Sequence, residues 1–237
     1  MGNTFVQEVD NIVFSGSSIA VTLPSAGAGN AYVFGLFWAQ APPVTLSSVA
    51  DDKGNTVALV GAALSEGNNG AQTGYAKNLA AGSTVITATF SGAIAEAKIW
   101  VHEVSGANTT APLGQNNSAV DSFRNATCTD CVASPSVTTA TNGEYVAGFC
   151  MSSSSPALDA GTGFTDPNPT NDSRGTSEYQ VQGAAGSIAA TFSRTDVTGA
   201  TAMVFVVTLI AAGGAAAARV PQSRPFPYKP GSPRGLR

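Results

Sequence analysis

The feature that most constrains the fold of this chain is a succession of short β-type runs separated by turn residues. The clearest is residues 83–91 (STVITATFS), in which Ile86 and Phe90 share one face and threonines occupy much of the other. This alternation is typical of a strand with one buried face. Residues 31–40 (AYVFGLFWAQ) are apolar on both faces, which predicts a central strand that is covered on both sides.

Similar runs recur along most of the chain. They lie at residues 9–15, 18–23, 44–50, 56–61, 97–105, 144–151, 177–182, 187–193 and 201–210. Their spacing is about 8–12 residues with Gly, Asn and Pro turns between them, and no segment shows a sustained helical period. The sequence therefore predicts an all-β protein: a two-sheet antiparallel β-sandwich, jelly-roll-like, over residues 1–211.

Three segments depart from this pattern. Residues 107–136 are polar with one candidate strand at 118–123, and residues 156–175 are rich in Gly, Pro, Asp and Asn. Both segments are expected to be irregular, and the second is expected to be a surface loop of the kind that carries binding sites. Residues 212–237 comprise a Gly/Ala hinge and a stretch with five prolines in nineteen residues. This composition predicts an extended Pro/Arg-rich C-terminal tail without ladder hydrogen bonds.

The tail also concentrates positive charge. From residue 219 onward it contains five basic and no acidic residues, whereas residues 1–218 contain six basic and fifteen acidic residues, a net charge of −9. A basic tail on an acidic body indicates an acidic partner, such as the body of another copy. The alternative is a tail that only keeps itself soluble. The residues expected to bind the partner are Arg219, Arg224, Phe226, Tyr228, Lys229, Arg234 and Arg237.

The overall composition suggests a setting outside the cell. Charged residues make up 11% of the chain, against about 25% in a typical soluble domain. Residues 1–10 (MGNTFVQEVD) have neither the basic region nor the apolar core of a secretory signal. We therefore expect a virion or extracellular protein with no signal peptide in this chain, and both release by host lysis and prior removal of a signal are open explanations.

Four segments in succession resemble a known module. They are residues 48–57 (SVADDKGNTV), 74–90 (GYAKNLAAGSTVITATF), 101–113 (VHEVSGANTTAPL) and, more loosely, 138–149 (TTATNGEYVAGF). Over most of residues 10–211 the chain resembles a β-sandwich module that recurs in uncharacterised bacterial surface proteins and in phage structural proteins. The resemblance implies the sandwich fold and an extracellular or virion setting, and it assigns no catalytic residues.

The chain offers little for nucleophilic catalysis. Its one histidine, His102, lies in the run 97–105, and the sequence has no Gly-x-Ser-x-Gly elbow. A catalytic nucleophile needs an adjacent base, so we expect His102 to bond to a neighbour within the sheet. Paired carboxylates for glycoside hydrolysis need only meet in space. By residue type alone, the candidates are Glu96, Glu103, Glu144 and Glu178.

The cysteines allow two interpretations. Cys128 and Cys131 form a Cys-x₂-Cys pair, and Cys150 with His102 would complete a Cys₃His set. Structural zinc sites usually contain two tight ligand pairs, and only one is present, so we predict no metal. A disulfide, either between Cys128 and Cys131 or from one of them to Cys150, is expected outside a cell. A buried thiol is the alternative for Cys150.

Acidic turns are a further candidate feature. Calcium ligands are available in two groups: Asp51, Asp52 and Asn55, and Asp159, Asp166, Asn168 and Asp172. Neither group has EF-hand spacing, so we predict ordinary turns without an ion. The chain contains no Gly-rich phosphate loop, and its acidic body argues against nucleic acid as the main ligand.

These observations favour a non-enzymatic structural or surface protein of an extracellular assembly. The specific prediction is a phage virion component, a capsid decoration or fibre-like subunit, whose tail binds other copies or other virion proteins. The alternative is a carbohydrate-binding or adhesive module of a bacterial surface protein that binds surface glycans through residues 156–175. We expect no cofactor and no membrane span, because only residues 203–210 of the uncharged stretch 197–218 are strongly apolar.

Overall fold

The computed structural model is all-β and antiparallel, as the sequence predicts. It describes residues 2–122, 128–152, 158–169, 174–194 and 201–213, and in these ranges it contains seventeen strands and no helix. Consequently no helix in the described ranges is long and apolar enough to cross a membrane. The tail residues 214–237 lie outside the described ranges, and so do all seven predicted partner-binding residues.

Residues 4–105 form a first unit of two sheets. Sheet A has the strand order β1-β8-β3-β6-β5, and sheet B has the order β2-β7-β4. The strands are β1 (Thr4–Val13), β2 (Gly16–Ala26), β3 (Ala31–Ala39), β4 (Leu46–Asp51), β5 (Val57–Glu66), β6 (Asn69–Ala76), β7 (Gly82–Ile94) and β8 (Glu96–Ser105). All pairings within both sheets are antiparallel.

Residues 113–209 form a second unit. Sheet D has the order β14-β12-β17-β9, while β10-β16-β13 (sheet E) and β11-β15 (sheet F) form two smaller sheets. The strands are β9 (Leu113–Ser122), β10 (Cys128–Ala133), β11 (Val137–Thr138), β12 (Tyr145–Ser152), β13 (Leu158–Ala160), β14 (Gly175–Val181), β15 (Ser187–Ile188), β16 (Thr191–Arg194) and β17 (Thr201–Leu209).

The two units have the same topology. The order β1-β8-β3-β6 in the first unit corresponds to β9-β17-β12-β14 in the second. The order β2-β7-β4 corresponds to β10-β16-β13, and the short pair β11-β15 extends the β10-β16 pair. This is the strand order of a jelly roll, in which strands wind as two Greek keys. In the described part of the second unit, β5 has no counterpart. The jelly-roll expectation is therefore confirmed twice in one chain.

Short sequence repeats accompany the structural repeat. The tetrapeptide Ala-Ala-Gly-Ser occurs at residues 80–83 and 184–187, and Ala-Thr-Phe-Ser occurs at 88–91 and 190–193. The first copy of each contributes to β7, and the second copy contributes to the equivalent strands β15 and β16. The sequence expectations above do not include this repeat, because strand periodicity alone does not distinguish one alternating strand from another.

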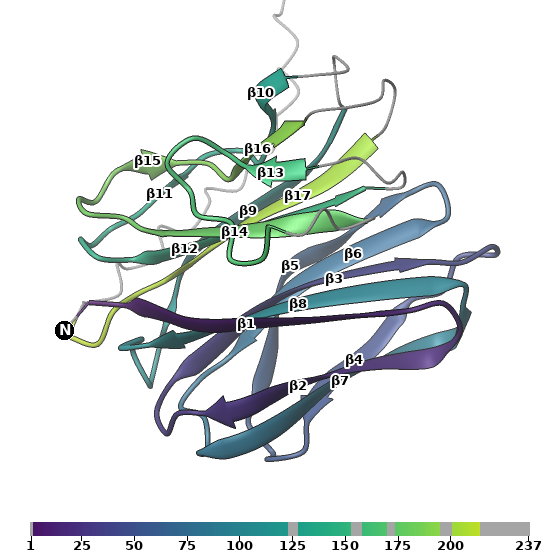
Figure 1. Cartoon of the computed structure of the whole chain (residues 1–237), viewed down its shortest axis with the longest axis horizontal. Coiled ribbons are helices and arrows are strands. Elements are labelled where there is room, and N and C mark those ends of the chain that lie inside the picture. Colours follow the sequence, from purple (N-terminus) through teal and green to yellow (C-terminus); the bar gives the residue numbers. More distant parts are fainter. Residues whose placement is uncertain (1, 123–127, 153–157, 170–173, 195–200, 214–237) are drawn as a thin grey trace, which may run out of the picture.

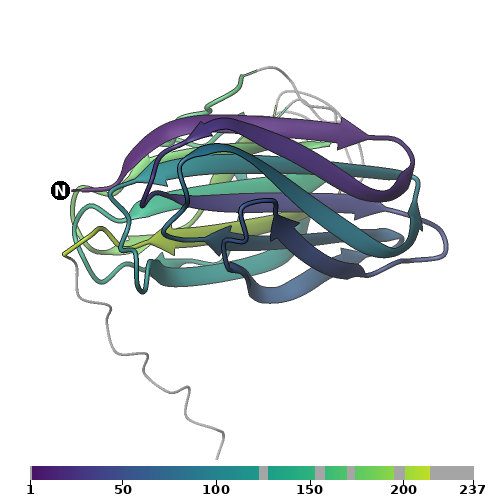
Figure 2. The same ribbon diagram turned by 90° about the horizontal axis from the view of Figure 1, so that it is seen from below.

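The sheets stack in four layers, in the order B, A, D and then E with F (Figure 1). Three hydrophobic clusters fill the spaces between successive layers. The strands run along the long axis of the stack, and the β1–β2 turn lies at the end opposite the N-terminus (Figure 2). Where the sequence predicts two sheets, the described residues form five, because the first jelly roll contributes sheets A and B and the second contributes sheets D, E and F. Sheets A and D face each other across the shared core.

The central strands β3 and β12 carry this shared core. In β3, Ala31, Val33 and Phe37 face sheet D, while the alternate residues face sheet B. Every residue from Ala31 to Trp38 is buried, which confirms the predicted doubly covered strand. Gly35 permits the close approach of the two units, because a β-carbon there would lie 2.5 Å from Cγ of Phe149.

Strand β6 was not predicted, and its glycines explain why. Gly70 and Gly74 give this segment a low β propensity. In the structure, however, the rings of Trp38 and Phe34 on β3 lie over these two glycines, at 2.2 and 2.6 Å from the positions that β-carbons would occupy. The glycines therefore make room for aromatic side chains of the neighbouring strand.

Candidate functional site

A row of polar side chains lies between the two jelly rolls. Glu96, Lys98, Trp100 and His102 alternate along β8, and all are buried. Trp100 belongs to the shared core between sheets A and D, so these four side chains face the second unit. We call Glu8, Asp10, Glu96, Lys98, His102, Arg174 and Ser177 the interlayer polar row, because their contacts join residues of β1 and β8 to residues at and before β14.

His102 is the most connected member of the row. Its Nδ1 lies 2.9 Å from the hydroxyl oxygen of Tyr145, and its Nε2 lies 2.8 Å from Oγ of Ser177 and 3.0 Å from Oε2 of Glu8. Ser177 in turn donates a 2.5 Å hydrogen bond to the same Glu8 oxygen. Burial, followed by the charges of Tyr179 and Glu8, raises the pKa of Tyr145 well above its usual value, which keeps the phenol protonated.

These residues include a serine, a histidine and a carboxylate, but their arrangement differs from a catalytic triad. In a triad, the base contacts the nucleophile through one ring nitrogen and the carboxylate through the other. Here, Ser177 and Glu8 share Nε2 of His102, and Tyr145 occupies Nδ1. The His102 and Ser177 side chains are also buried. The geometry is that of a hydrogen-bonded brace between β1, β8, β12 and β14.

Two ion pairs extend the row toward the start of β8. Nζ of Lys98 lies 3.2 Å from Oδ2 of Asp10 and 5.0 Å from the centroid of the Trp100 ring. Nε of Arg174 donates to both carboxylate oxygens of Glu96, at 2.7 and 2.8 Å. The Lys98–Asp10 pair joins β8 to β1 within the first unit, whereas the Glu96–Arg174 pair joins the two units. Charge-assisted hydrogen bonds of this kind are about twice as strong as neutral ones.

The other glutamates proposed from residue type also stabilise loops. Glu103 accepts hydrogen bonds from the Gly27 backbone and the Asn30 amide, and Glu144 accepts them from the backbone of Ala140 and Thr141.

Glu178 has the same type of role in the second unit. Its two oxygens accept hydrogen bonds from the backbone N–H groups of Gly161 and Thr191. Burial raises the pKa of this carboxyl well above its usual value, and the two N–H donors oppose that shift. Thus, among the residues that the structure describes, each of the four glutamates considered for glycoside hydrolysis has its own hydrogen-bond partners.

Asp166 lies beside the interlayer polar row. Its Oδ1 accepts from the Asn168 backbone at 2.9 Å, and its Oδ2 accepts from Thr176 Oγ1 at 3.4 Å. Burial, with a smaller contribution from the charge of Glu8, raises the pKa of the Asp166 carboxyl above 3.8. The folded chain therefore binds this proton more tightly than the unfolded chain does.

We predict that Asp166→Asn gains stability relative to the parent as the pH rises. The stabilisation linked to the Asp166 proton is complete below pH 3.8 and is lost as the pH rises through the raised pKa. The asparagine side chain keeps an oxygen that can accept from the Asn168 backbone and places an N–H donor beside Thr176. Unlike the carboxyl group, it does not titrate between pH 3 and pH 7. Urea unfolding of both proteins from pH 3 to pH 7 measures the difference, and a difference that shrinks with rising pH would contradict the prediction.

The cysteines are in two states. Cys131 is disulfide-bonded, whereas Cys150 keeps its thiol and is buried between sheet D and the outer sheets. The predicted disulfide that includes Cys150 is therefore not formed. Cys150 has the other predicted state, a buried thiol. Cys128 begins β10, and its side chain lies outside the described part of the structure.

The acidic turns use their carboxylates internally. Asp51 accepts hydrogen bonds from the backbone of Lys53 and Asn55 and from the Asn55 side chain. Asp166 and Asn168 lie in the loop before β14, and Asp172 lies outside the described ranges. Within those ranges, no three His, Cys, Asp or Glu residues gather closely enough to hold a metal ion.

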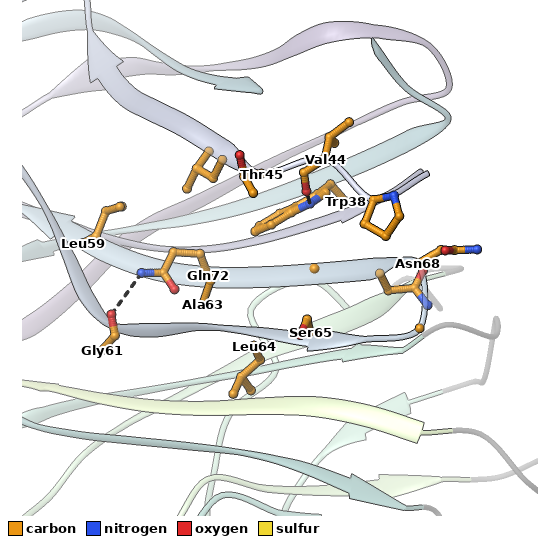
Figure 3. A pocket seen from close by; sticks show the side chains of 15 residues that line it. Trp38, Val44, Thr45, Leu59, Gly61, Ala63, Leu64, Ser65, Asn68 and Gln72 are labelled. Atoms are coloured by element: carbon orange, nitrogen blue, oxygen red, sulfur yellow. Dashed lines mark hydrogen bonds between the residues drawn. The ribbon is translucent and has the colours of Figure 1, made fainter. Parts of the chain in front are cut away.

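A groove in the first unit is the second candidate site. It lies between β4 of sheet B and the β5–β6 pair of sheet A, and its volume is about 490 Å³, within the usual range of ligand pockets. Figure 3 shows Trp38 and Val44 along one side, β5 along the other, and Gln72 between them. We call this the β4–β5 groove. Sequence reasoning missed it because its lining comes from three separate segments.

A bulge in β5 accounts for the opening. Val60 pairs with Thr73 and Leu64 pairs with Ala71, so three residues of β5 lie opposite the single residue Gln72. Gly61 starts this bulge with φ of +70°, a conformation that glycine adopts without strain. Among the strands in the described ranges, β5 pairs only with β6, and β4 pairs only with β7. The edges of β4 and β5 are therefore left unpaired on the two sides of the groove.

Gln72 has incomplete hydrogen bonding in this groove. Its side chain is 3% exposed, and its Nε2 donates to the Gly61 carbonyl at a long 3.4 Å. Its Oε1 is buried and has no hydrogen-bond partner. An unpartnered buried acceptor is costly, so the groove offers a position for a ligand group with an N–H or O–H. Comparison with known protein families and with curated protein sequences finds no match for this chain.

Proposed function

We propose that this chain is a non-enzymatic structural or surface protein of an extracellular assembly, and specifically a phage virion component such as a capsid decoration or fibre-like subunit. The observation that carries this proposal is the stacking of two jelly rolls on one shared core. At that junction, buried His102 and Glu96 of the first unit bond to Ser177 and Arg174 of the second. Such an arrangement supports a rigid building block better than it supports chemistry on a substrate.

The tail gives the rigid body a means of attachment. Just before the tail the chain is anchored to the first unit: Ala211 forms a bridge to Ala107, and the Ala212 N–H donates to the Gly106 carbonyl. The basic residues begin at Arg219, beyond this anchor. A basic, proline-rich segment that follows a fixed anchor point suits attachment to an acidic neighbour.

We predict that truncation after Gly213 leaves folding intact and abolishes assembly. The truncated chain keeps the Ala107–Ala211 bridge and all three hydrophobic clusters, so its melting temperature should equal that of the full chain. Size-exclusion chromatography with light scattering, together with negative-stain microscopy, measures assembly of both proteins. Unchanged assembly of the truncated chain, or a large fall in its melting temperature, would show that the tail has a different role.

A matched full-length variant tests whether the positive charge of the tail is needed for assembly. Replacement of the five basic tail residues by glutamine keeps the length, the prolines and the aromatic residues. If attachment is electrostatic, this variant assembles less than the full chain at low salt, and the full chain itself loses assembly as salt rises. Equal assembly of both proteins would assign attachment to the apolar tail residues instead.

The alternative function, a carbohydrate-binding or adhesive module, has one observation in its favour. The β4–β5 groove places an indole beside side-chain amides, which are groups that bind sugars by stacking and hydrogen bonding. Trp38, however, is only 4% exposed, which leaves little ring surface for stacking. Retention of the monomeric full chain on a polysaccharide column, without self-assembly, would favour this alternative.

A further inference from the structure

We propose that the β4–β5 groove binds the C-terminal tail of a second copy of this chain, with Phe226 and Tyr228 as the anchoring side chains. This inference rests on the proposed assembly function and names the surface that receives the tail. It follows from the groove's lining, its unpartnered acceptor, the composition of the tail, and the distance between the tail's origin and the groove.

The lining of the groove is suited to aromatic and proline side chains. Val44, Leu46 and Leu59 line it together with the Trp38 indole, and Leu59 is 49% exposed. The Trp38 Nε1–H already donates to the Val44 carbonyl and the indole is 4% exposed, so the three aliphatic side chains supply most of the accessible apolar lining. Grooves lined by aromatic and aliphatic side chains are the recurrent receptors of proline-rich segments, because proline stiffens the ligand before it binds.

The tail has the matching chemistry. In residues 224–230 (RPFPYKP), Phe226 and Tyr228 alternate with prolines, so an extended chain presents them two residues apart as neighbouring anchors. The segment's uncharged side-chain donor is the Tyr228 hydroxyl, since its other side-chain donors belong to the charged Arg224 and Lys229. We assign this hydroxyl to the unpartnered Oε1 of Gln72.

The opposite charges of the tail and the body also favour binding of the tail to a second copy. The body carries a net charge of −9, and the tail carries five positive charges and no negative ones. Attraction of this kind raises the rate of encounter and orients the partner, and salt weakens it. The apolar groove then supplies the specific contacts.

The position of the tail's origin favours a neighbouring copy over the chain's own tail. Ala211 pairs with Ala107 just beyond the end of β8, whereas Trp38 in the groove pairs with Ala97 near the start of β8. The ten residues of β8 separate these places by roughly 30 Å. Thirteen residues from Gly213 to Phe226 span roughly 40 Å in a polyproline conformation, which leaves little slack for a path around the chain's own surface.

The first test uses the truncated body, residues 1–213, and a fluorescent peptide of residues 219–237. We expect the body to bind the peptide, and Leu59→Asp to weaken binding by at least about tenfold because it places a charge in the apolar lining. Val181→Asp is the matched control: Val181 is 42% exposed and lies on β14, the far edge strand of sheet D. This control should bind as the parent does.

The second test is a double-mutant cycle on the assigned hydrogen bond. A peptide with Tyr228→Phe should bind the parent body several-fold more weakly, and it should bind a Gln72→Leu body as well as the unmodified peptide does. Equal losses on both bodies would overturn the assignment of Tyr228 to Gln72. Melting curves of every body variant establish that each is folded before binding is compared.

The outcomes distinguish this inference from the proposed function. If tail truncation abolishes assembly while the peptide binds the parent, Leu59→Asp and Val181→Asp bodies equally, the tail acts at another surface and the groove proposal is overturned. If Leu59→Asp abolishes binding to a polysaccharide and the peptide never binds, the groove is a glycan site. If the peptide binds the groove but full-length protein remains monomeric, the groove holds the chain's own tail, and the second-copy proposal is overturned.

Discussion

Phe149→Ala is expected to lower the free energy of unfolding by about 3–5 kcal/mol, the usual cost of emptying a buried phenylalanine site. The Phe149 ring is fully buried in the shared core. It lies directly over the Gly35 backbone, so its removal opens a cavity at the junction of the two jelly rolls. Because both units supply this core, we expect one shifted unfolding transition and not two.

Urea unfolding followed by tryptophan fluorescence measures this effect. The chain has two tryptophans: Trp38 reports on the core between sheets A and B, and Trp100 reports on the shared core. Phe90→Ala, which empties a site in the first of these cores, is the control for simple cavity formation. If Phe149→Ala gives two transitions and the Trp38 signal keeps the parent midpoint, the shared core does not couple the units.

His102→Ala is expected to destabilise the protein by about 3–5 kcal/mol, as is usual when one partner of a buried polar cluster is removed. The substitution leaves the buried hydroxyl of Tyr145 and the carboxylate of Glu8 without their contacts to the imidazole. It also empties space next to Phe149, whose ring centroid lies 5.2 Å from that of His102. The effect therefore combines lost hydrogen bonds with a cavity.

Ser177→Ala is the matched control for this prediction. It removes one hydroxyl, which donates to the Glu8 carboxylate, but keeps the contacts of His102 with Glu8 and Tyr145, so we expect a cost of about 1.5–3 kcal/mol, the range for a hydrogen bond to a charged group. Chemical denaturation of both variants at one pH measures the difference. A cost for His102→Ala no greater than that for Ser177→Ala would show that the imidazole is not the centre of the brace.

Local patterns were sufficient to predict strands that are apolar on one face, such as residues 83–91, and strands that are apolar on both faces, such as residues 31–40. The alternation at residues 83–91 predicted that Ile86 and Phe90 are buried together, and both are. The bulge of β5 and strand β6 could not be predicted in the same way. Gly70 and Gly74 are weak strand formers in isolation. They suit this strand because the Trp38 and Phe34 rings of β3 lie over them, where a β-carbon would clash.

The candidate sites were even less accessible to sequence reasoning. His102 was expected to bond to a neighbour, but its partners Tyr145 and Ser177 lie 43 and 75 residues away in the chain. The lining of the β4–β5 groove comes from residues 38–72, and the unpartnered Gln72 oxygen belongs to the residue opposite the three-residue bulge of β5. Neither arrangement leaves a periodic signal.

The sequence by itself determined that this chain is all-β and antiparallel, because alternation with a period of two and the chemistry of turns are local properties. Only the tertiary structure decided that two jelly rolls stack on a shared core. The polar residues Glu96, Lys98 and His102 alternate along β8 as they would on a solvated face. They are buried because Arg174, Asp10 and Ser177 meet them from distant segments, and burial of charge is set by partners in space and not by neighbours in sequence.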